Sequence, residues 1–263
     1  MAGGELTGRA ALVTGGARGL GLGTAQALAA AGARVMIADV LKDVGEQTAA
    51  GIGGAAFVEL DVTEDAQWEA AVAHTVAELG GLDIVVNNAG VEVTALIADA
   101  DPDEHRRMFD VNLLGTLLGL KHAFRAMRPG GAAGRGGTVI NVASVAATIA
   151  FPAIAGYSAT KSGVDRLTRV AAMESGKLGY GVRVNCVHPG LVPTEMGVKL
   201  AVETSELGLF ENPDAAVAAV IGLTPSGRLA EVSDIADAVV FLASDRSRFV
   251  NGVGLPVDGG MGM

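Results

Sequence analysis

The chain has 263 residues, of which half are hydrophobic and 18% are charged, and its mean hydropathy is +0.41. This composition supports a deep core and excludes an intrinsically disordered chain. A formal net charge of −10 argues against a nucleic-acid or anionic-membrane partner, because phosphates are bound by clustered lysine and arginine. The single cysteine, Cys186, excludes an internal disulfide. The four histidines share no metal-binding spacing, so no metal is expected.

Short β-branched runs alternate along the chain with stretches of helical period. Continuous apolar strands separated by helices indicate a parallel sheet covered on both faces, and right-handed crossovers then give a doubly wound fold. We therefore expect residues 1–263 to form a single α/β domain, a Rossmann fold with a seven-stranded parallel sheet and helices on both faces. Strands are predicted at 10–14, 34–38, 56–60, 83–86, 138–142, 182–187 and 254–257, and helices at about 20–31, 42–50, 64–79, 103–127, 157–178 and 231–244.

Three stretches need separate interpretation. Residues 136–160 carry no charge and are long enough to cross a bilayer, but Asn141 and Pro152 within them favour a buried strand, a loop and the start of a helix. The first residues hold an acid and no long apolar run, so no secretory signal is expected and the protein is predicted to be cytoplasmic. The excursion 195–228 is irregular and longer than a simple connection requires, which predicts a substrate lid.

The first predicted strand ends in a glycine-rich turn that opens the first predicted helix. The turn reads Thr14-Gly-Gly-Ala-Arg-Gly-Leu-Gly21, which differs from the GxGxxG spacing of the usual dinucleotide fingerprint. Glycines at a strand-to-helix turn let the backbone approach a pyrophosphate, and the helix N-terminus attracts it. The turn therefore predicts a dinucleotide site formed by Gly15, Arg18, Gly19, Leu20 and Gly21.

Asp39 follows the second predicted strand, 24 residues beyond Gly15. A carboxylate at this place accepts hydrogen bonds from the ribose hydroxyls of NAD and repels the 2′-phosphate of NADP. Arg18 argues in the opposite direction, because an arginine in the glycine turn can bind that phosphate. Asp39 occupies the ribose position itself and Val40 follows it, so NAD is the expected cofactor.

The stretch Ala155-Gly-Tyr-Ser-Ala-Thr-Lys161 holds Tyr157, one of two tyrosines in the chain, and places Lys161 four positions later. A free tyrosine has a pKa near 10, and a cation within about 4–6 Å lowers it. Positions i and i+4 share one face of a helix, so this spacing permits an activated tyrosine. Taken alone, it is more simply an aromatic core residue beside a solvated lysine.

Further features lie in order on this scaffold: Asn87-Asn-Ala-Gly90 after the fourth strand, Asn112 in a helix, Ser144 after the fifth strand, and then Tyr157 with Lys161. Together with the glycine turn they resemble the classical short-chain dehydrogenase/reductase family over nearly the whole chain. The segments TGGARGLG, ADVL, LDVT and VDGG are most similar to bacterial NAD-dependent hydroxysteroid dehydrogenases. The resemblance implies an NAD-dependent oxidoreductase that interconverts a secondary alcohol and a ketone.

The resemblance also implies a role for each residue of the set. Tyr157 is the general base in oxidation, while Lys161 lowers its pKa and hydrogen-bonds the nicotinamide ribose. Ser144 binds the substrate oxygen, and Asn112 holds a water in the proton relay. A homotetramer is implied, in which helices 103–127 and 157–178 pack against their copies. Further cofactor contacts are implied at Asp61, Val62, Asn88, Ala89, Gly90, Val111, Pro189, Gly190, Val192 and Thr194.

The substrate pocket is expected to be mostly apolar, apart from Glu92 and Glu195. Such a wall fits a bulky, uncharged alicyclic or hydroxysteroid alcohol. A 3-oxoacyl thioester reductase of fatty-acid synthesis is an alternative, which Asp39 and the acidic surface oppose. A non-catalytic dinucleotide-binding regulator is another, which the complete set of catalytic residues opposes. The predicted substrate contacts are Ser144, Val145, Ile149, Phe151, Tyr157 and Met196.

Overall fold

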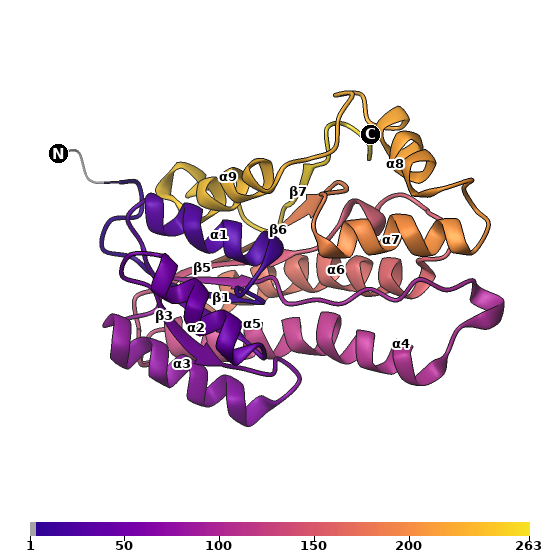
Figure 1. The fold of residues 1–263 in the computed structure, drawn as a ribbon. Helices are drawn as coiled ribbons and strands as arrows, with labels where there is room; N and C mark the ends of the chain where they lie inside the picture. The colour runs from indigo at the N-terminus through magenta and orange to yellow at the C-terminus, as the bar shows by residue number, and fades with distance from the viewer. Residues whose placement is uncertain (1–3) are drawn as a thin grey trace.

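The computed structural model describes residues 4–263 and contains a continuous seven-stranded parallel sheet with helices on both faces (Figure 1). The strand order is β3-β2-β1-β4-β5-β6-β7, so the chain winds outwards from β1 first in one direction and then in the other. The predicted doubly wound α/β fold is confirmed, and the strand ends lie within two residues of those predicted. The strands are β1 (Ala10–Thr14), β2 (Arg34–Asp39), β3 (Ala56–Glu59), β4 (Ile84–Asn87), β5 (Gly137–Val142), β6 (Val182–Pro189) and β7 (Gly254–Val257).

Two apolar cores lie on opposite faces of the sheet. Alternate strand residues point to opposite faces, so Leu12 and Met36 pack in one core while Val13 and Ile37 pack in the other. Burial on both faces explains why the strands read as continuous hydrophobic runs. One face is covered by α1 (Gly19–Ala30), α2 (Lys42–Gly51) and α9 (Val232–Ala243), and the other by α3 (Asp65–Leu79), α5 (Gly115–Met127) and α6 (Ala155–Leu178).

The helix predicted over 103–127 is interrupted in the structure. It consists of α4 (Pro102–Phe109), a π-helical turn at Asp110–Leu114, and then α5. Asp101 caps α4 by accepting hydrogen bonds from the backbone N–H groups of Asp103 and Glu104, and Pro102 begins the helix. The three segments follow one another without a gap, which is why the sequence pattern reads as one helix. Such turns are frequent at functional sites.

The prediction that 195–228 is irregular is wrong, because most of this excursion is helical. It forms α7 (Glu195–Glu206) and α8 (Pro213–Gly222), which pack against each other (Figure 1). The Thr194 side chain caps α7, and the Asn212 side chain caps α8 just ahead of Pro213. An asparagine followed by proline is a helix-start signal that the low amphipathic periodicity of this stretch concealed.

The uncharged stretch 136–160 forms β5, a loop and the beginning of α6, as predicted. Within residues 4–263, no helix has both the length and the hydropathy needed to cross a membrane. Because all strands are parallel, the loops that follow β1, β2, β4, β5 and β6 meet at one edge of the sheet. That edge is where a doubly wound fold binds its ligands.

Candidate active site

A cavity of about 1050 Å³ opens at the carboxyl ends of the strands, between the glycine turn and the helices α7 and α8. It lies at the switch point of the sheet, where β1 and β4 send the chain in opposite directions. Three predicted site residues, Gly21, Asn112 and Ile149, are absent from its wall as the described residues define it. The predicted residues that do line it are Gly15, Arg18, Gly19, Leu20, Asp39, Val40, Asp61, Val62, Asn88, Ala89, Gly90, Val111, Ser144, Val145, Phe151, Tyr157, Lys161, Pro189, Gly190, Val192, Thr194 and Met196.

The glycine turn is packed too closely for any side chain at its key positions. Gly15 has a φ of +60°, and a Cβ on Gly21 would lie 2.0 Å from the Gly15 carbonyl oxygen. Asn88 fastens the turn to the end of β4, since its Nδ2 donates to the carbonyls of Thr14 and Gly15 at 2.9 and 3.1 Å. Within residues 4–263, no side chain caps the start of α1. Its first N–H groups therefore remain available to an anion, and the turn fits a pyrophosphate.

Asp39 is fixed at the end of β2 by two backbone hydrogen bonds. Its Oδ2 accepts from the N–H of Ala17 at 3.0 Å, and its Oδ1 accepts from the N–H of Leu41 at 3.1 Å. The neighbouring Arg18 reaches across the cavity mouth, where its Nη1 lies 2.5 Å from Oε2 of Glu195 on α7. The two charged groups that bear on cofactor choice are therefore held in different ways, Asp39 by the backbone and Arg18 by the helix α7.

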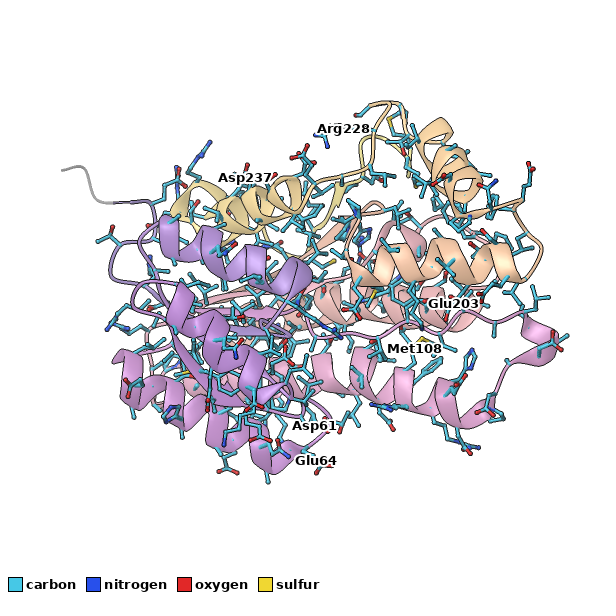
Figure 2. All side chains as sticks on the ribbon, viewed as in Figure 1. Asp61, Glu64, Met108, Glu203, Arg228 and Asp237 are labelled. Atoms are coloured by element: carbon cyan, nitrogen blue, oxygen red, sulfur yellow. The ribbon has the colours of Figure 1, made fainter. Side chains whose placement is uncertain are left out.

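The loop after β3 supplies the next part of the wall (Figure 2). Asp61 Oδ1 accepts hydrogen bonds from both the backbone N–H and the hydroxyl of Thr63, at 2.9 and 2.8 Å. Val62 is buried, and its carbonyl accepts from Trp68 Nε1 at 3.0 Å. Gly115 packs directly on Val62, where a Cβ would come within 2.8 Å of the valine side chain. This rigid loop fits the adenine end of a dinucleotide.

Asn112 lies in the π-helical turn and is fully buried behind the cavity wall. Its Oδ1 accepts from the N–H of Val91 at 2.8 Å, and its Nδ2 donates to the Val91 carbonyl at 2.9 Å and to the hydroxyl of Thr160 at 3.1 Å. The side chain thus joins the loop after β4 to the helix that carries Tyr157. Its predicted role in a proton relay stays a prediction; these contacts give it a structural role between the two segments.

Tyr157 and Lys161 lie one turn apart on α6, with the Lys161 Nζ 5.5 Å from the centre of the Tyr157 ring. The Lys161 ammonium donates to the carbonyl of Val142, at the end of β5, at 2.8 Å. Burial lowers the pKa of Lys161 to about 8 and raises the pKa of Tyr157 to about 12. The expected lowering of the Tyr157 pKa is therefore wrong for the protein alone, because desolvation of the phenolate dominates.

Ser144 follows β5 and lies beside Tyr157 in the cavity wall. Its Oγ accepts from the N–H of Ala146 at 3.1 Å, which fixes the turn at Val145–Ala147. The proximity of its hydroxyl opposes the rise in the pKa of Tyr157, whereas the charge of Glu92 adds to that rise. The serine hydroxyl, the tyrosine hydroxyl and a buried lysine thus converge on one wall, which suits proton transfer to or from a substrate oxygen.

The last residues of the chain contribute to the cavity wall, and this contribution was not predicted from the sequence. Met261 lines the cavity because the tail folds back around Asp258, whose carboxylate accepts from the N–H groups of Gly260 and Gly262, each at 2.9 Å. An aspartate followed by two glycines is a recognisable turn signal. Ile154, Ala216 and Val220 also line the wall and were not predicted.

Away from the cavity, the fold brings together three side chains that linear spacing does not connect. Asp165 Oδ1 lies 3.2 Å from His188 Nε2, and Cys186 Sγ lies 3.5 Å from the same nitrogen. These donor atoms are all within 4.8 Å of one another, as in a possible metal site. Arg169, however, already holds both oxygens of the Asp165 carboxylate, and burial raises the pKa of Cys186 to about 12. The cluster is thus satisfied as a hydrogen-bonded network with an inert thiol.

Comparison with known proteins finds dehydrogenases and reductases, which agrees with a cavity that joins a dinucleotide site to proton-transfer residues. The family described as Enoyl-(Acyl carrier protein) reductase matches residues 15–262. The chain is 42% identical to trans-4-hydroxycyclohexanecarboxylate dehydrogenase of Sinomonas cyclohexanicum, covering 96% of this chain and 92% of that protein. It is 40% identical to 3-alpha-(or 20-beta)-hydroxysteroid dehydrogenase of Mycobacterium bovis, with 98% and 90% covered. The structure of 3-ketoacyl-(acyl-carrier-protein) reductase from Brucella melitensis, complexed with NADH, superposes with a TM-score of 0.85 at 32% identity, with 98% and 100% covered.

Proposed function

Because the chain belongs to the short-chain dehydrogenase/reductase family, which binds a nicotinamide dinucleotide, we propose that NAD is its cofactor and a bulky, uncharged alicyclic or steroid-like alcohol its substrate. The protein is an oxidoreductase that interconverts a secondary alcohol and a ketone. The observation that carries the proposal is the convergence of Ser144, Tyr157 and Lys161 on one cavity with the glycine turn. Proton transfer and dinucleotide binding thereby share a single site.

The choice of NAD rests on the two charged groups at the ribose end of the cavity. Asp39 is buried and fixed by the backbone, so a 2′-phosphate placed there meets an uncompensated negative charge. Arg18, the natural partner for such a phosphate, is bound to Glu195. Both features favour a cofactor with a free ribose hydroxyl.

A dinucleotide held by the glycine turn and Asp39 would accept or supply the hydride at its nicotinamide ring. Tyr157 takes the hydroxyl proton in oxidation and returns it to the carbonyl oxygen in reduction. Ser144 donates a hydrogen bond to that oxygen and stabilises the charge that develops on it. Lys161 lies buried beside the phenol ring, where its charged form would offset part of the cost of forming a buried phenolate. Asn112 holds the loop after β4 against α6. It thereby fixes the position of that loop relative to the helix that carries Tyr157 and Lys161.

The predicted substrate class rests on the apolar part of the wall. Val145, Phe151 and Met196 line the cavity as predicted, joined by Ile154 and Val220. Such a surface can cover a ring system and would contribute about 25 cal/mol per Å² of apolar area removed from water. The helices α7 and α8 are proposed to close over the ligand and exclude water.

We also propose a homotetramer built on α4, α5 and α6. Leu117 on α5 and Val170 and Met173 on α6 are exposed in the single chain, and exposed apolar side chains on these helices support an interface there. A thioester reductase is the less favoured function: the matching family and the Brucella melitensis structure are named for acyl-carrier-protein substrates, but the two curated relatives reported above, which have higher identity, are named for cyclic alcohols. The experiment that tests the proposal is NADH formation with cyclic secondary alcohols.

A further inference from the structure

Glu92 is an acidic side chain inside the substrate end of the cavity, and the reaction outlined above does not use it. It follows β4 in the loop that begins with Asn88, lines the cavity and is only 8% exposed. Its charge raises the pKa of Tyr157, so it lies close enough to the reacting oxygen to interact with it. A buried acid is costly unless something bonds to it.

The loop that carries Glu92 is fixed on both sides. Val91 is clamped by Asn112, through hydrogen bonds of 2.8 and 2.9 Å to its N–H and carbonyl. The N–H of Ala95 donates to the carbonyl of Ala153 at 2.8 Å, and Ala153 itself has a φ of +66°, a conformation that non-glycine residues rarely adopt. Glu92 is therefore held in place at the wall, as a residue that contacts a ligand must be.

Glu92 has fewer hydrogen-bond partners than it can use. Both carboxyl oxygens lie near the hydroxyl of Thr94, at 2.9 and 3.0 Å, but a hydroxyl has one proton and an ionised carboxylate accepts about four hydrogen bonds. Burial raises the pKa of Glu92, and so does the nearby charge of Glu203. The side chain is thus a hydrogen-bonding group facing the cavity with spare capacity.

The ammonium group of the neighbouring Lys199 does not supply the hydrogen bonds that Glu92 lacks. Lys199 lines the cavity but its Nζ is 3.2 Å from Oε1 of Glu203, one turn along α7. Figure 2 shows Glu203 at the edge of α7 that is turned towards α6 and Met108 of α4. Its other oxygen, Oε2, is buried without a partner among the described residues. Of these three groups only Glu92 and Lys199 line the cavity, and Lys199 is engaged by Glu203, so the surroundings of Glu92 are unfavourable for an anion.

We infer that Glu92 binds a second hydroxyl group of the substrate, so that the preferred substrate is a hydroxylated alicyclic alcohol with an oxygen on the ring besides the one that reacts. This inference rests on the proposed alcohol dehydrogenase function and names its substrate class. A hydroxyl can donate to Glu92 when the acid is ionised and accept from it when protonated. The ring itself lies on the apolar wall of Phe151 and Met196. A purely apolar ring leaves Glu92 buried with a single donor, and a ring carboxylate is repelled by it.

The wild-type enzyme tests this directly. We would measure kcat/KM for NAD-dependent oxidation of the 1,2-, 1,3- and 1,4-cyclohexanediols, of the methyl- and methoxycyclohexanols of matching geometry, and of trans-4-hydroxycyclohexanecarboxylate. A hydrogen bond to an acid predicts that the best diol exceeds its methyl counterpart by about tenfold or more, above the roughly twofold statistical advantage of two carbinols. The methoxy compound, which can only accept, should match the diol if Glu92 is protonated and fall to the level of the methyl compound if it is ionised. Equal or better oxidation of the methyl compounds, or of the carboxylate, would overturn the inference.

Two variants then assign the preference to Glu92. In Glu92→Leu the ratio of diol to methylcyclohexanol should fall to about the statistical twofold, and in Glu92→Gln it should stay intermediate, because an amide still bonds to a hydroxyl. Lys199→Met, the matched control from the same end of the cavity, should keep the diol preference. A ratio unchanged in Glu92→Leu would refute the role of Glu92. If no secondary alcohol is oxidised at all, the proposed function itself fails; oxidation without a diol preference defeats this inference alone.

Discussion

Arg18 and Glu195 form an ion pair across the mouth of the cavity, with the guanidinium Nη1 2.5 Å from the carboxylate Oε2. The pair joins the glycine turn to the first residue of α7, two segments 177 residues apart in the sequence. Both side chains are largely exposed, so the pair contributes little to global stability. Its consequence is local: it keeps Arg18 beside α7 instead of leaving it free for a phosphate.

Cofactor choice should follow from this pair and from Asp39. We expect kcat/KM to favour NAD over NADP by at least about tenfold, equivalent to about 1.4 kcal/mol. Glu195→Gln should narrow that ratio by releasing Arg18, whereas Glu206→Gln, an exposed position at the end of the same helix, should leave it as in the wild type. Equal kcat/KM values for the two cofactors in the wild type would show that Arg18 outweighs Asp39.

Replacement of Tyr157 by phenylalanine should abolish turnover while NAD binding stays largely intact, since the ring is kept and only the proton-transfer group is lost. The expected loss in kcat is 10²–10⁴-fold, with cofactor affinity followed by calorimetry. Tyr180→Phe is the matched control: Tyr180 packs edge-on against Phe124, away from the cavity. If Tyr157→Phe keeps more than about a tenth of the activity, the general-base role is refuted.

The pH dependence of stability should report the burial of Lys161. Its pKa falls from 10.5 to about 8 on folding, so between these pH values the unfolded chain binds more protons and stability rises with pH. The rise attributable to this group is about 3 kcal/mol. Tyr157 acts in the opposite direction at higher pH, because its pKa rises from 10.0 to about 12 and stability falls across that window.

Denaturant unfolding of the wild type and of Lys161→Met, at a series of pH values from 8 to 10.5, checks this sign. The variant should lack the rise seen in the wild type, whatever its absolute stability. Parallel pH profiles for the two proteins would show that Lys161 is not buried in the folded state.

The chain should assemble through the exposed apolar residues of α5 and α6. Met173 is 74% exposed and Val170 is 54% exposed, and an aspartate at either place would leave a charge buried in the expected interface. Sedimentation velocity should show a tetramer for the wild type and a smaller species for Met173→Asp. Val44→Asp, on the exposed surface of α2, is the control and should stay tetrameric. A monomeric wild type at micromolar concentration would contradict the proposed assembly.

Local patterns in the sequence were sufficient to predict the sheet, and the ordered motifs singled out Ser144, Tyr157 and Lys161, which line one cavity. The strands are apolar on both sides because both faces are covered, and Tyr157 and Lys161 share a helix face because of their spacing. Other features depend on contacts between distant segments. The Arg18–Glu195 pair and the cluster around Asp165 have no local pattern, and the turn signal at Asp258 does not reveal that Met261 reaches the cavity.

Two further differences from prediction have energetic causes. The pKa of Tyr157 depends on how deeply the phenol is buried, which spacing to Lys161 does not reveal. The helices α7 and α8 follow from caps at Thr194 and Asn212, whose signals are short compared with an amphipathic period.

Steady-state NADH formation across a panel of secondary alcohols tests most directly whether this cavity oxidises bulky cyclic alcohols. The panel should compare cyclohexanols of increasing ring size and steroid alcohols with short open-chain, polyhydroxylated open-chain and phosphorylated alcohols, all with NAD as oxidant. We predict that kcat/KM is highest for the cyclic compounds and that KM falls as apolar bulk is added near the carbinol, because each buried Å² contributes about 25 cal/mol. Higher kcat/KM for short polar or phosphorylated alcohols, or no NADH formation with any cyclic alcohol, would contradict it.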